Sequence, residues 1–352
     1  MSPTDATPTG SAKCPRAVIF GCAGTRLDAA EAAFFRHSDP LGFILFKRNC
    51  ETPEQLSALT TDLRASVGRG NAPVLIDQEG GRVVRMGAPH WRVPPAAGEI
   101  GALAARDSVA GRRAAWLNAR LIAADLRQAG ITVCCLPVLD LRFPGASDVV
   151  GDRAFSSDPD LVAELGRAAA EGLLAGGVLP SIKHMPGHGR AMADSHHEMP
   201  RVDAPLGEME ASDFRPFHAL RDLPIGLSAH ILYTAIDGDL PGTLSPKVIG
   251  EAIRGAIGFD GLLLSDDLSM EALSGSLGER AEAALAAGCD IALHCNGKLE
   301  EMTDIAERVG ALSPEVNTRW VRVVKYTKQK NNINYSNLES EFNNLMEYIL
   351  GA

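Results

Sequence analysis

The sequence predicts an α/β fold, a (β/α)₈ barrel of the TIM type that forms a single domain. Short apolar runs alternate with longer Ala-rich segments eight times along the 352 residues. The longer segments carry apolar residues at three- and four-residue spacing, as helices lying on a sheet do. Strand and helix alternating in this way indicate a parallel sheet, and eight such units close most naturally into a barrel. A doubly wound open sheet is the second choice.

Eight predicted strands have the length and apolar character of buried strands, and they lie at 17–21, 42–46, 72–77, 131–140, 178–184, 224–230, 261–267 and 289–295. The clearest predicted helices are 53–68, 107–129, 158–177 and 276–288. We expect residues 1–15 to be disordered, 16–312 to form the catalytic barrel and 313–352 to form a helical tail. The composition of that tail turns to Lys, Asn and Tyr from about Lys325.

Composition excludes several classes of function. A formal net charge of -10 and a pI near 5.4 argue against nucleic-acid or anionic-membrane partners, which require a basic stripe. No run of eighteen apolar residues and no apolar signal segment occurs. Seven cysteines without CxxC spacing suit a reducing compartment. We therefore expect a cytoplasmic protein, and we expect a monomer.

The stretch 179–200 changes from an apolar run to a polar loop punctuated by glycine. Four histidines fall within its residues 184–197. Zinc is one alternative, but Pro186 and Gly187 break the helix that would align His184 with His188, and no Cys pair or HExxH lies nearby. A structural role, bonding loop backbone, is our preferred interpretation for His188. A solvated loop without a role is the third alternative.

His196 differs from the other histidines because Asp194 precedes it by two positions. A carboxylate beside an imidazole orients the ring and stabilises its cation, which makes the histidine a usable acid or base near neutral pH.

Polar side chains follow six of the eight predicted strands, where a barrel places its catalytic groups. They are Lys47 and Arg48; Asp77, Glu79, Arg82 and Arg85; Asp140; Lys183 and His184; His230; and Asp266 and Asp267. We interpret Asp77, Arg85 and Arg153 as contacts for a hydroxyl-rich ligand, with surface ion pairing as the alternative. Neither GxGxxG nor GxxxxGK[ST] occurs, so nucleotide binding has little support.

Two adjacent carboxylates, Asp266 and Asp267, end one strand. Both cannot point into the barrel mouth, so we expect one to be functional and the other to cap or pair with a neighbour. A carboxylate with a separate acid/base is the minimum machinery for glycoside hydrolysis with retention.

Taken together, the motifs GFILFKRN, IDQEGGRVVR, PVLDL, GDRAF, KHMPGHG, ADSH, SDDLSM and AGCDIAL resemble those of glycoside hydrolase family 3, and specifically its β-N-acetylglucosaminidases. The resemblance covers roughly residues 17–310. It implies that Asp266 is the nucleophile, that His196 is the general acid/base and that Asp194 is its dyad partner. It also implies that Asp77, Arg85, Arg153, Lys183 and His184 hold the N-acetylglucosamine ring and its acetamido group.

Asp140 and His188 are further possible site residues, and no metal or cofactor is implied. By the same resemblance the substrate is an N-acetylglucosaminyl-anhydro-muropeptide from cell-wall recycling. The sequence departs from the family pattern at Met185, Asp152 and Arg190, and the last of these bears on what the leaving-group side accepts.

Three other functions stay open at this point. A glycoside phosphorylase is one, because a histidine acid/base does not repel phosphate as a carboxylate does. A non-catalytic sugar-binding barrel is another, and a metal-dependent hydrolase comes last.

Overall fold

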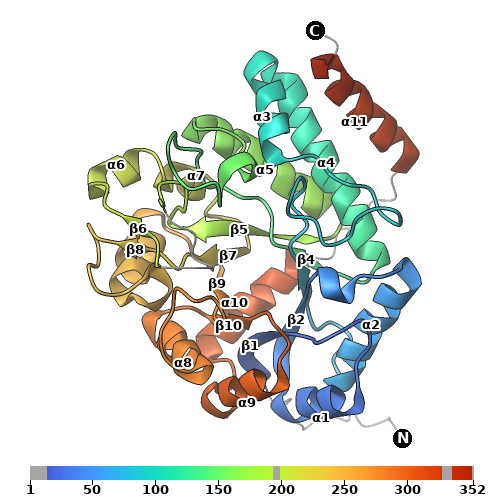
Figure 1. Ribbon diagram of the computed structural model, residues 1–352, viewed down its shortest axis with the longest axis vertical. Helices are drawn as coiled ribbons and strands as arrows, with labels where there is room; N and C mark the ends of the chain where they lie inside the picture. Colours follow the sequence, from blue (N-terminus) through green and yellow to red (C-terminus); the bar gives the residue numbers. More distant parts are fainter. Residues whose placement is uncertain (1–13, 193–198, 327–334, 351–352) are drawn as a thin grey trace, which may run out of the picture.

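A computed structural model describes residues 14–192, 199–326 and 335–350. Eight parallel strands close into a barrel in the order β1-β10-β9-β7-β5-β4-β3-β2, with the helices outside it (Figure 1). This confirms the predicted fold class, and each predicted strand corresponds to one strand of the barrel. The strands are β1 Arg16–Gly21, β2 Pro40–Leu45, β3 Val74–Ile76, β4 Val133–Cys134, β5 Leu179–Met185, β7 Ile225–Ser228, β9 Leu262–Asp267 and β10 Ile291–His294.

The helices alternate with these strands, as the spacing of apolar residues predicts. The α-helices are α1 Ala29–Ser38, α2 Pro53–Ser66, α3 Ala97–Arg106, α4 Ser108–Gln128, α5 Pro159–Ala175, α6 Leu206–Ala211, α7 Phe214–Ala219, α8 Leu277–Ala287, α9 Leu299–Arg308, α10 Pro314–Lys325 and α11 Tyr335–Leu350. Short 3₁₀ turns occur at η1 Lys47–Asn49, η2 Gly151–Arg153 and η3 Gly242–Leu244, and η4 Val248–Ala256 is a π-helix.

Several helices begin at a polar cap followed by proline. Thr52, Asp158 and Ser313 each accept a hydrogen bond from a main-chain N–H of the first turn, and proline occupies the next position of α2, α5 and α10. Proline is well suited to that position, since its missing N–H would have no partner inside the helix and its φ is already helical. These start signals explain why the predicted helix boundaries agree closely with the structure.

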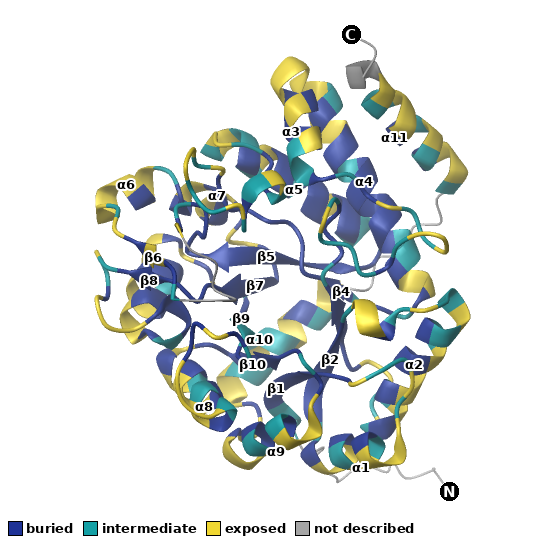
Figure 2. Cartoon of the chain, in the orientation of Figure 1, coloured by how far each residue is buried: buried dark blue, intermediate teal, exposed yellow. Residues whose placement is uncertain are grey.

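The barrel core consists of aliphatic and aromatic side chains between the strands and the inner faces of the helices. Figure 2 shows the barrel strands mostly buried, whereas the outer faces of the helices are exposed. β4 is shorter than the predicted run 131–140, because the N–H of Leu136 donates to the carbonyl of Cys134 in its own segment and Pro137, which follows, has no N–H. A two-stranded parallel sheet of β6 Arg201–Val202 and β8 Leu232–Tyr233 was not predicted.

An ionic network closes the end of the barrel where the strands begin. Asp290 accepts hydrogen bonds from Nη2 of Arg254 at 2.9 Å, from Nη1 of Arg319 at 3.0 Å and from the main-chain N–H of Leu263 at 2.8 Å. Arg319 belongs to α10, so this carboxylate ties α10 to the starts of β9 and β10. The network lies at the opposite end of the strands from the site described below.

The last helix, α11, packs beside α4 and α3 (Figure 1). Phe342 and Leu338 are buried, and Arg113 of α4 donates two hydrogen bonds to Glu341, at 2.7 and 2.8 Å. Among the described residues, no helix is long and apolar enough to cross a membrane.

Candidate active site

A pocket of about 170 Å³ opens at the carboxyl ends of the strands, the end at which the polar side chains were predicted to gather. Predicted residues that line it are Asp77, Arg85, Arg153, Lys183, His184, His188, Asp266 and Asp267. Apolar walls come from Phe46, Leu227, Met270 and Leu293, among others. The pocket therefore combines a charged floor with apolar sides, as sites for small polar ligands do.

Lys183, at the end of β5, lies between two carboxylates that follow β3. Its Nζ is 2.7 Å from Oδ1 of Asp77 and 2.6 Å from Oε1 of Glu79. Burial acts to lower the pKa of Lys183, but the two carboxylates outweigh it and hold that pKa above its usual range. Lys183 is thus a buried cation at neutral pH, and the pairing supplies the compensation that such a charge needs.

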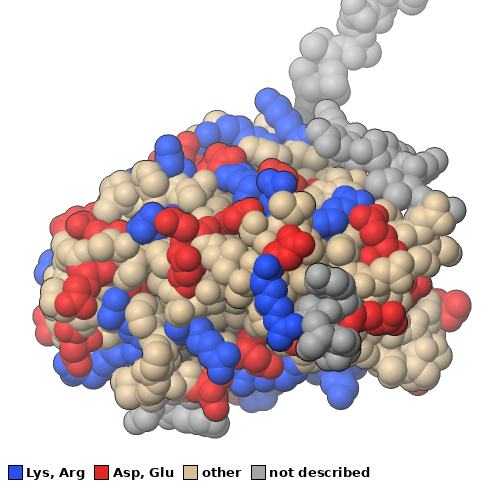
Figure 3. Space-filling model, turned by 90° about the horizontal axis from the view of Figure 1, so that it is seen from above, with Lys and Arg blue, Asp and Glu red and all other residues tan. Residues whose placement is uncertain are grey.

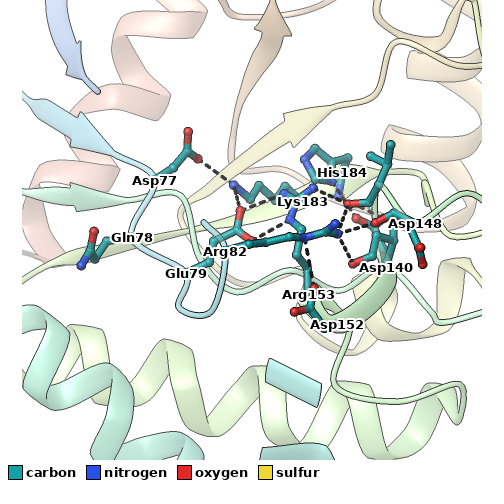
Figure 4. A network of polar contacts seen from close by, with 12 residues as sticks. Asp77, Gln78, Glu79, Arg82, Asp140, Asp148, Asp152, Arg153, Lys183 and His184 are labelled. Carbon is teal, nitrogen blue, oxygen red and sulfur yellow. Dashed lines mark hydrogen bonds and ion pairs between the residues drawn. The ribbon is translucent and has the colours of Figure 1, made fainter. Parts of the chain in front are cut away.

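Arg153 lies on η2, in the loop after β4, and forms a two-point contact with Glu79. Its Nε donates to Oε2 and its Nη2 to Oε1, both at 2.8 Å, while Nη1 donates to the carbonyl of Val149 at 3.0 Å (Figure 4). Burial acts to raise the pKa of Glu79, but Lys183 and Arg153 hold it well below its usual range. Glu79 is therefore an anion that three donors satisfy.

Arg82 fixes the loop that carries Arg153. Its Nε is 3.1 Å from Oδ1 of Asp152, and its Nη2 donates to main-chain carbonyls of the same loop, among them Val149 at 2.9 Å. Asp152, one of the departures from the family pattern, therefore keeps an ion pair between the loops after β3 and β4.

Asp140, after β4, is fully enclosed and holds the start of the loop after β5. Its Oδ2 is 2.6 Å from Nδ1 of His184, and its Oδ1 accepts the main-chain N–H of His188 at 2.7 Å. Burial acts to raise the pKa of Asp140, but the neighbouring His184 lowers it below its usual range. Asp140 is therefore ionised, so Nδ1 of His184 is the donor.

His188 is buried and lines the pocket. Burial, and then the neighbouring His184, lower its pKa to about 4, although Asp140 acts to raise it. Its ring is 5.5 Å from that of His184, and its Nδ1 bonds no other described residue. The main-chain N–H of His188 helps to hold this loop, whereas a structural role for its ring stays a prediction.

Asp266 and Asp267 end β9 and have different surroundings. Asp267 accepts hydrogen bonds from the main-chain N–H of Ser269 at 3.0 Å, from the Ser269 hydroxyl at 2.7 Å and from the main-chain N–H of Cys295 at 3.1 Å. Asp266 accepts one, through Oδ1, from the main-chain N–H of Asp267 at 2.8 Å. Asp267 is thus the carboxylate that holds the local turn, and Asp266 is the one with free acceptor capacity facing the pocket.

The electrostatic surroundings of Asp266 keep it ionised. Burial acts to raise its pKa, but the neighbouring His184 and His230 and the N–H of Asp267 outweigh burial and hold the pKa below its usual range. A carboxylate that is ionised at neutral pH can attack an electrophilic carbon.

Five of the predicted strand-end residues do not line the pocket: Arg82 and Asp140, described above, and Lys47, Arg48 and His230. Lys47 is exposed, and Arg48 donates to the carbonyls of Cys22 and Cys295. His230 is buried between Thr243 and the main-chain carbonyl of Asp267, at 2.8 and 2.9 Å. Asp194 and His196 lie outside the described residues.

Arg190 lies at the start of the segment that leads to Asp194 and His196. Its Nε donates to Oδ2 of Asp213 at 2.8 Å, and its guanidinium carbon lies 4.2 Å from the centre of the Phe143 ring. Arg190 therefore links the loops after β4 and β5 to α7.

Glu79 is the site residue that the sequence analysis did not assign. Its position could have assigned it to the site, because Glu79 lies two residues after Asp77 and alternate residues at a strand end point to the same side. In the described part of the chain, no three His, Cys, Asp or Glu side chains form a group that could hold a metal.

A (β/α)₈ barrel with an ionised carboxylate facing a charged pocket at the carboxyl ends of its strands has the arrangement expected of a glycoside hydrolase. The family model for the Glycosyl hydrolase family 3 N terminal domain matches residues 19–326, and the chain belongs to this family.

Relatives of known sequence and structure agree with this assignment. The chain is 40% identical over 308 residues to a Beta-hexosaminidase of Bordetella avium, a match that covers 86% of each chain. The crystal structure of NagZ from Neisseria gonorrhoeae in complex with N-trifluoroacetyl-D-glucosamine matches with a TM-score of 0.83 at 30% identity, covering 96% of this chain and 98% of that one. A β-N-acetylglucosaminidase of the family from Paenibacillus sp. matches with a TM-score of 0.80 at 28% identity, covering 90% of this chain and 63% of that one.

Proposed function

We propose that this glycoside hydrolase is an exo-acting β-N-acetylglucosaminidase that retains the configuration at the anomeric carbon. The observation that carries the proposal is the contrast between Asp266 and Asp267, because it leaves one ionised carboxylate available at the pocket wall. The Beta-hexosaminidase relatives and the N-trifluoroacetyl-D-glucosamine complex of the related NagZ support the choice of sugar.

In the first step of the proposed reaction, an oxygen of Asp266 attacks the anomeric carbon. The bond from that carbon to the leaving-group oxygen breaks with its electron pair, and the leaving oxygen takes a proton from the acid. A glycosyl ester of Asp266 results. By resemblance the acid is His196, oriented by Asp194.

In the second step, His196 takes a proton from water, and the water oxygen attacks the anomeric carbon from the face that the leaving group vacated. The ester bond breaks and Asp266 leaves as a carboxylate. Two inversions at one carbon give net retention, so the first sugar product is the β-anomer.

The sugar itself is held by Asp77, Arg85, Arg153, Lys183 and His184 in this proposal. Their geometry supports it, because Asp77 has one strong partner in Lys183 and a longer one, at 3.3 Å, in Nη2 of Arg85. Acceptor capacity therefore remains on Asp77 for a sugar hydroxyl.

As the natural substrate we propose N-acetylglucosaminyl-anhydro-muropeptides of peptidoglycan recycling, hydrolysed by a monomer in the cytoplasm. The cysteines support a reducing compartment, because all seven have free thiols. The face of the molecule in Figure 3 mixes acidic and basic side chains without a basic stripe, in keeping with a small-molecule partner.

The test is the hydrolysis of p-nitrophenyl β-N-acetylglucosaminide by the wild type and by Asp266→Asn, with NMR of the first sugar anomer. We expect the wild type to release the β-anomer and the variant to lose turnover. Release of a sugar 1-phosphate in phosphate buffer would identify a phosphorylase. A folded wild type that binds N-acetylglucosamine without turnover would identify a sugar-binding barrel.

A further inference from the structure

We infer that Glu79 is the residue that positions Arg153 and Lys183 for the sugar, and that it does not bind the sugar itself. This inference rests on the proposed function, since it concerns the same pocket. The inference gives different roles to Asp77 and Glu79, the two acids of the DQEGG motif, which lie two positions apart and look equivalent in sequence.

The hydrogen bonds of the two acids distinguish them. Glu79 accepts three charged contacts at 2.6 to 2.8 Å, which engage both of its oxygens, and its side chain is 5% exposed. Asp77 accepts one contact at 2.7 Å and one at 3.3 Å, and its side chain is 17% exposed. The acceptor capacity of Glu79 is consumed inside the protein, whereas Asp77 keeps some for a ligand.

Glu79 limits the orientations that its two donors, Lys183 and Arg153, can adopt. The ammonium of Lys183 has three N–H bonds. Two of them point to Asp77 and Glu79, so the third stays available for the sugar. Arg153 is held by Glu79 through Nε and Nη2 and by the Val149 carbonyl through Nη1, which fixes the plane of its guanidinium. Figure 4 shows dashed lines that join Glu79 to both Lys183 and Arg153.

The backbone beside Glu79 is equally constrained. Gly80 and Gly81 follow it with φ of 119° and 55°, values that favour glycine. A Cβ on Gly80 would lie 2.0 Å from the carbonyl oxygen of Pro95, and the N–H of Gly81 donates to the carbonyl of Pro94 at 2.9 Å. The tight turn presses against residues 94–96, which fixes the main chain that carries the carboxylate.

The test compares Glu79→Gln with the wild type. Loss of a partner from a buried charge pair leaves its donors uncompensated, and we expect KM for p-nitrophenyl β-N-acetylglucosaminide and Kd for N-acetylglucosamine to rise about 10- to 100-fold. Arg153→Met should cause a similar or larger rise, and the rise in the double variant should be smaller than the product of the two single rises, because both substitutions remove the Glu79–Arg153 contact.

Glu341→Gln is the matched control, since Glu341 also binds an arginine through two hydrogen bonds but lies on α11, remote from the pocket. It should leave KM and Kd unchanged. If Glu79→Gln does not fold, Glu79→Asp keeps the charge but shortens its reach, and it should show the same loss of affinity.

Unchanged KM and Kd in a folded Glu79 variant, or additive effects with Arg153→Met, would overturn the inference. Failure of the proposed function would instead be visible in the wild type, as absence of turnover or of N-acetylglucosamine binding.

Discussion

Asp140 holds His184 at two atoms: its Oδ2 accepts from the ring Nδ1 at 2.6 Å, and its Oδ1 accepts from the main-chain N–H at 3.3 Å. The ring is therefore fixed in orientation, and its tautomer is set with the proton on Nδ1. A pairing of this kind, in which a buried carboxylate orients a histidine, lets the other ring nitrogen act on a ligand.

Asp140→Asn should lower kcat/KM by about 100-fold or more, because the amide cannot reproduce the charge that orients His184. Steady-state kinetics on the aryl glycoside measures this. Asp222→Asn is the control, since Asp222 pairs with Arg167 on the surface. Normal kinetics for Asp140→Asn would show that the orientation of His184 does not matter to the reaction.

Asp266→Asn and Asp267→Asn should behave differently although the residues are neighbours. The first should reduce kcat by more than about 1,000-fold with a normal melting temperature, because no glycosyl ester can form. The second should destabilise the fold by about 1–3 kcal/mol, since it disturbs three hydrogen bonds of the turn. Calorimetry and kinetics on both variants separate the roles, and the reverse pattern would exchange the two assignments.

His196→Ala tests the acid/base role that the resemblance implies. Turnover of a disaccharide substrate should fall about 100-fold or more, whereas an activated aryl glycoside should be affected much less, because its leaving group needs little protonation. The measurement is kcat/KM against the pKa of the leaving group. Equal losses for all leaving groups would count against His196 as the acid.

The contact between α4 and α11 predicts a pH-dependent stability. Burial raises the pKa of Asp125 to about 6, against smaller downward effects of Arg92 and of a 3.4 Å hydrogen bond from Tyr335. The folded state thus binds a proton more tightly than the unfolded state, whose aspartate titrates near pH 3.9. Binding of this proton therefore adds to the free energy of unfolding. The added stability is fully present below about pH 4 and is lost as the pH rises through about 6.

Asp125→Asn should therefore be more stable than the wild type at pH 8, by about 1–2 kcal/mol, and nearly equal to it at pH 4. Urea unfolding at the two pH values measures this difference. An equal difference at both pH values would contradict the assignment to Asp125.

Much of the fold was predictable from local sequence. Apolar runs define the strands, and caps such as Thr52 and Ser313 define where helices begin, so neighbouring residues carry the information. The pair β6 and β8 was not predictable, because two-residue strands have no periodicity and their pairing joins residues about 31 positions apart, as Arg201 does with Leu232.

The candidate site was predictable in its residues but not in its pairs. A barrel brings strand ends together, and Asp77, Lys183 and Asp266 accordingly share one pocket. The partner of Glu79 is Arg153, 74 positions further along the chain, and Asp140 meets His184 across 44. Such pairs depend on the register and tilt of the closed barrel, which no local pattern records. The catalytic roles themselves stay predictions.

The network around Asp290 and the cluster around Glu79 occupy opposite ends of the same strands. The first ties α10 to the starts of β9 and β10, whereas the second joins the end of β5 to the loops after β3 and β4. We therefore expect a substitution at Asp290 to act mainly on the free energy of unfolding, and a substitution at Glu79 to act mainly on sugar affinity. Stability and ligand affinity can then be changed through different residues of one barrel.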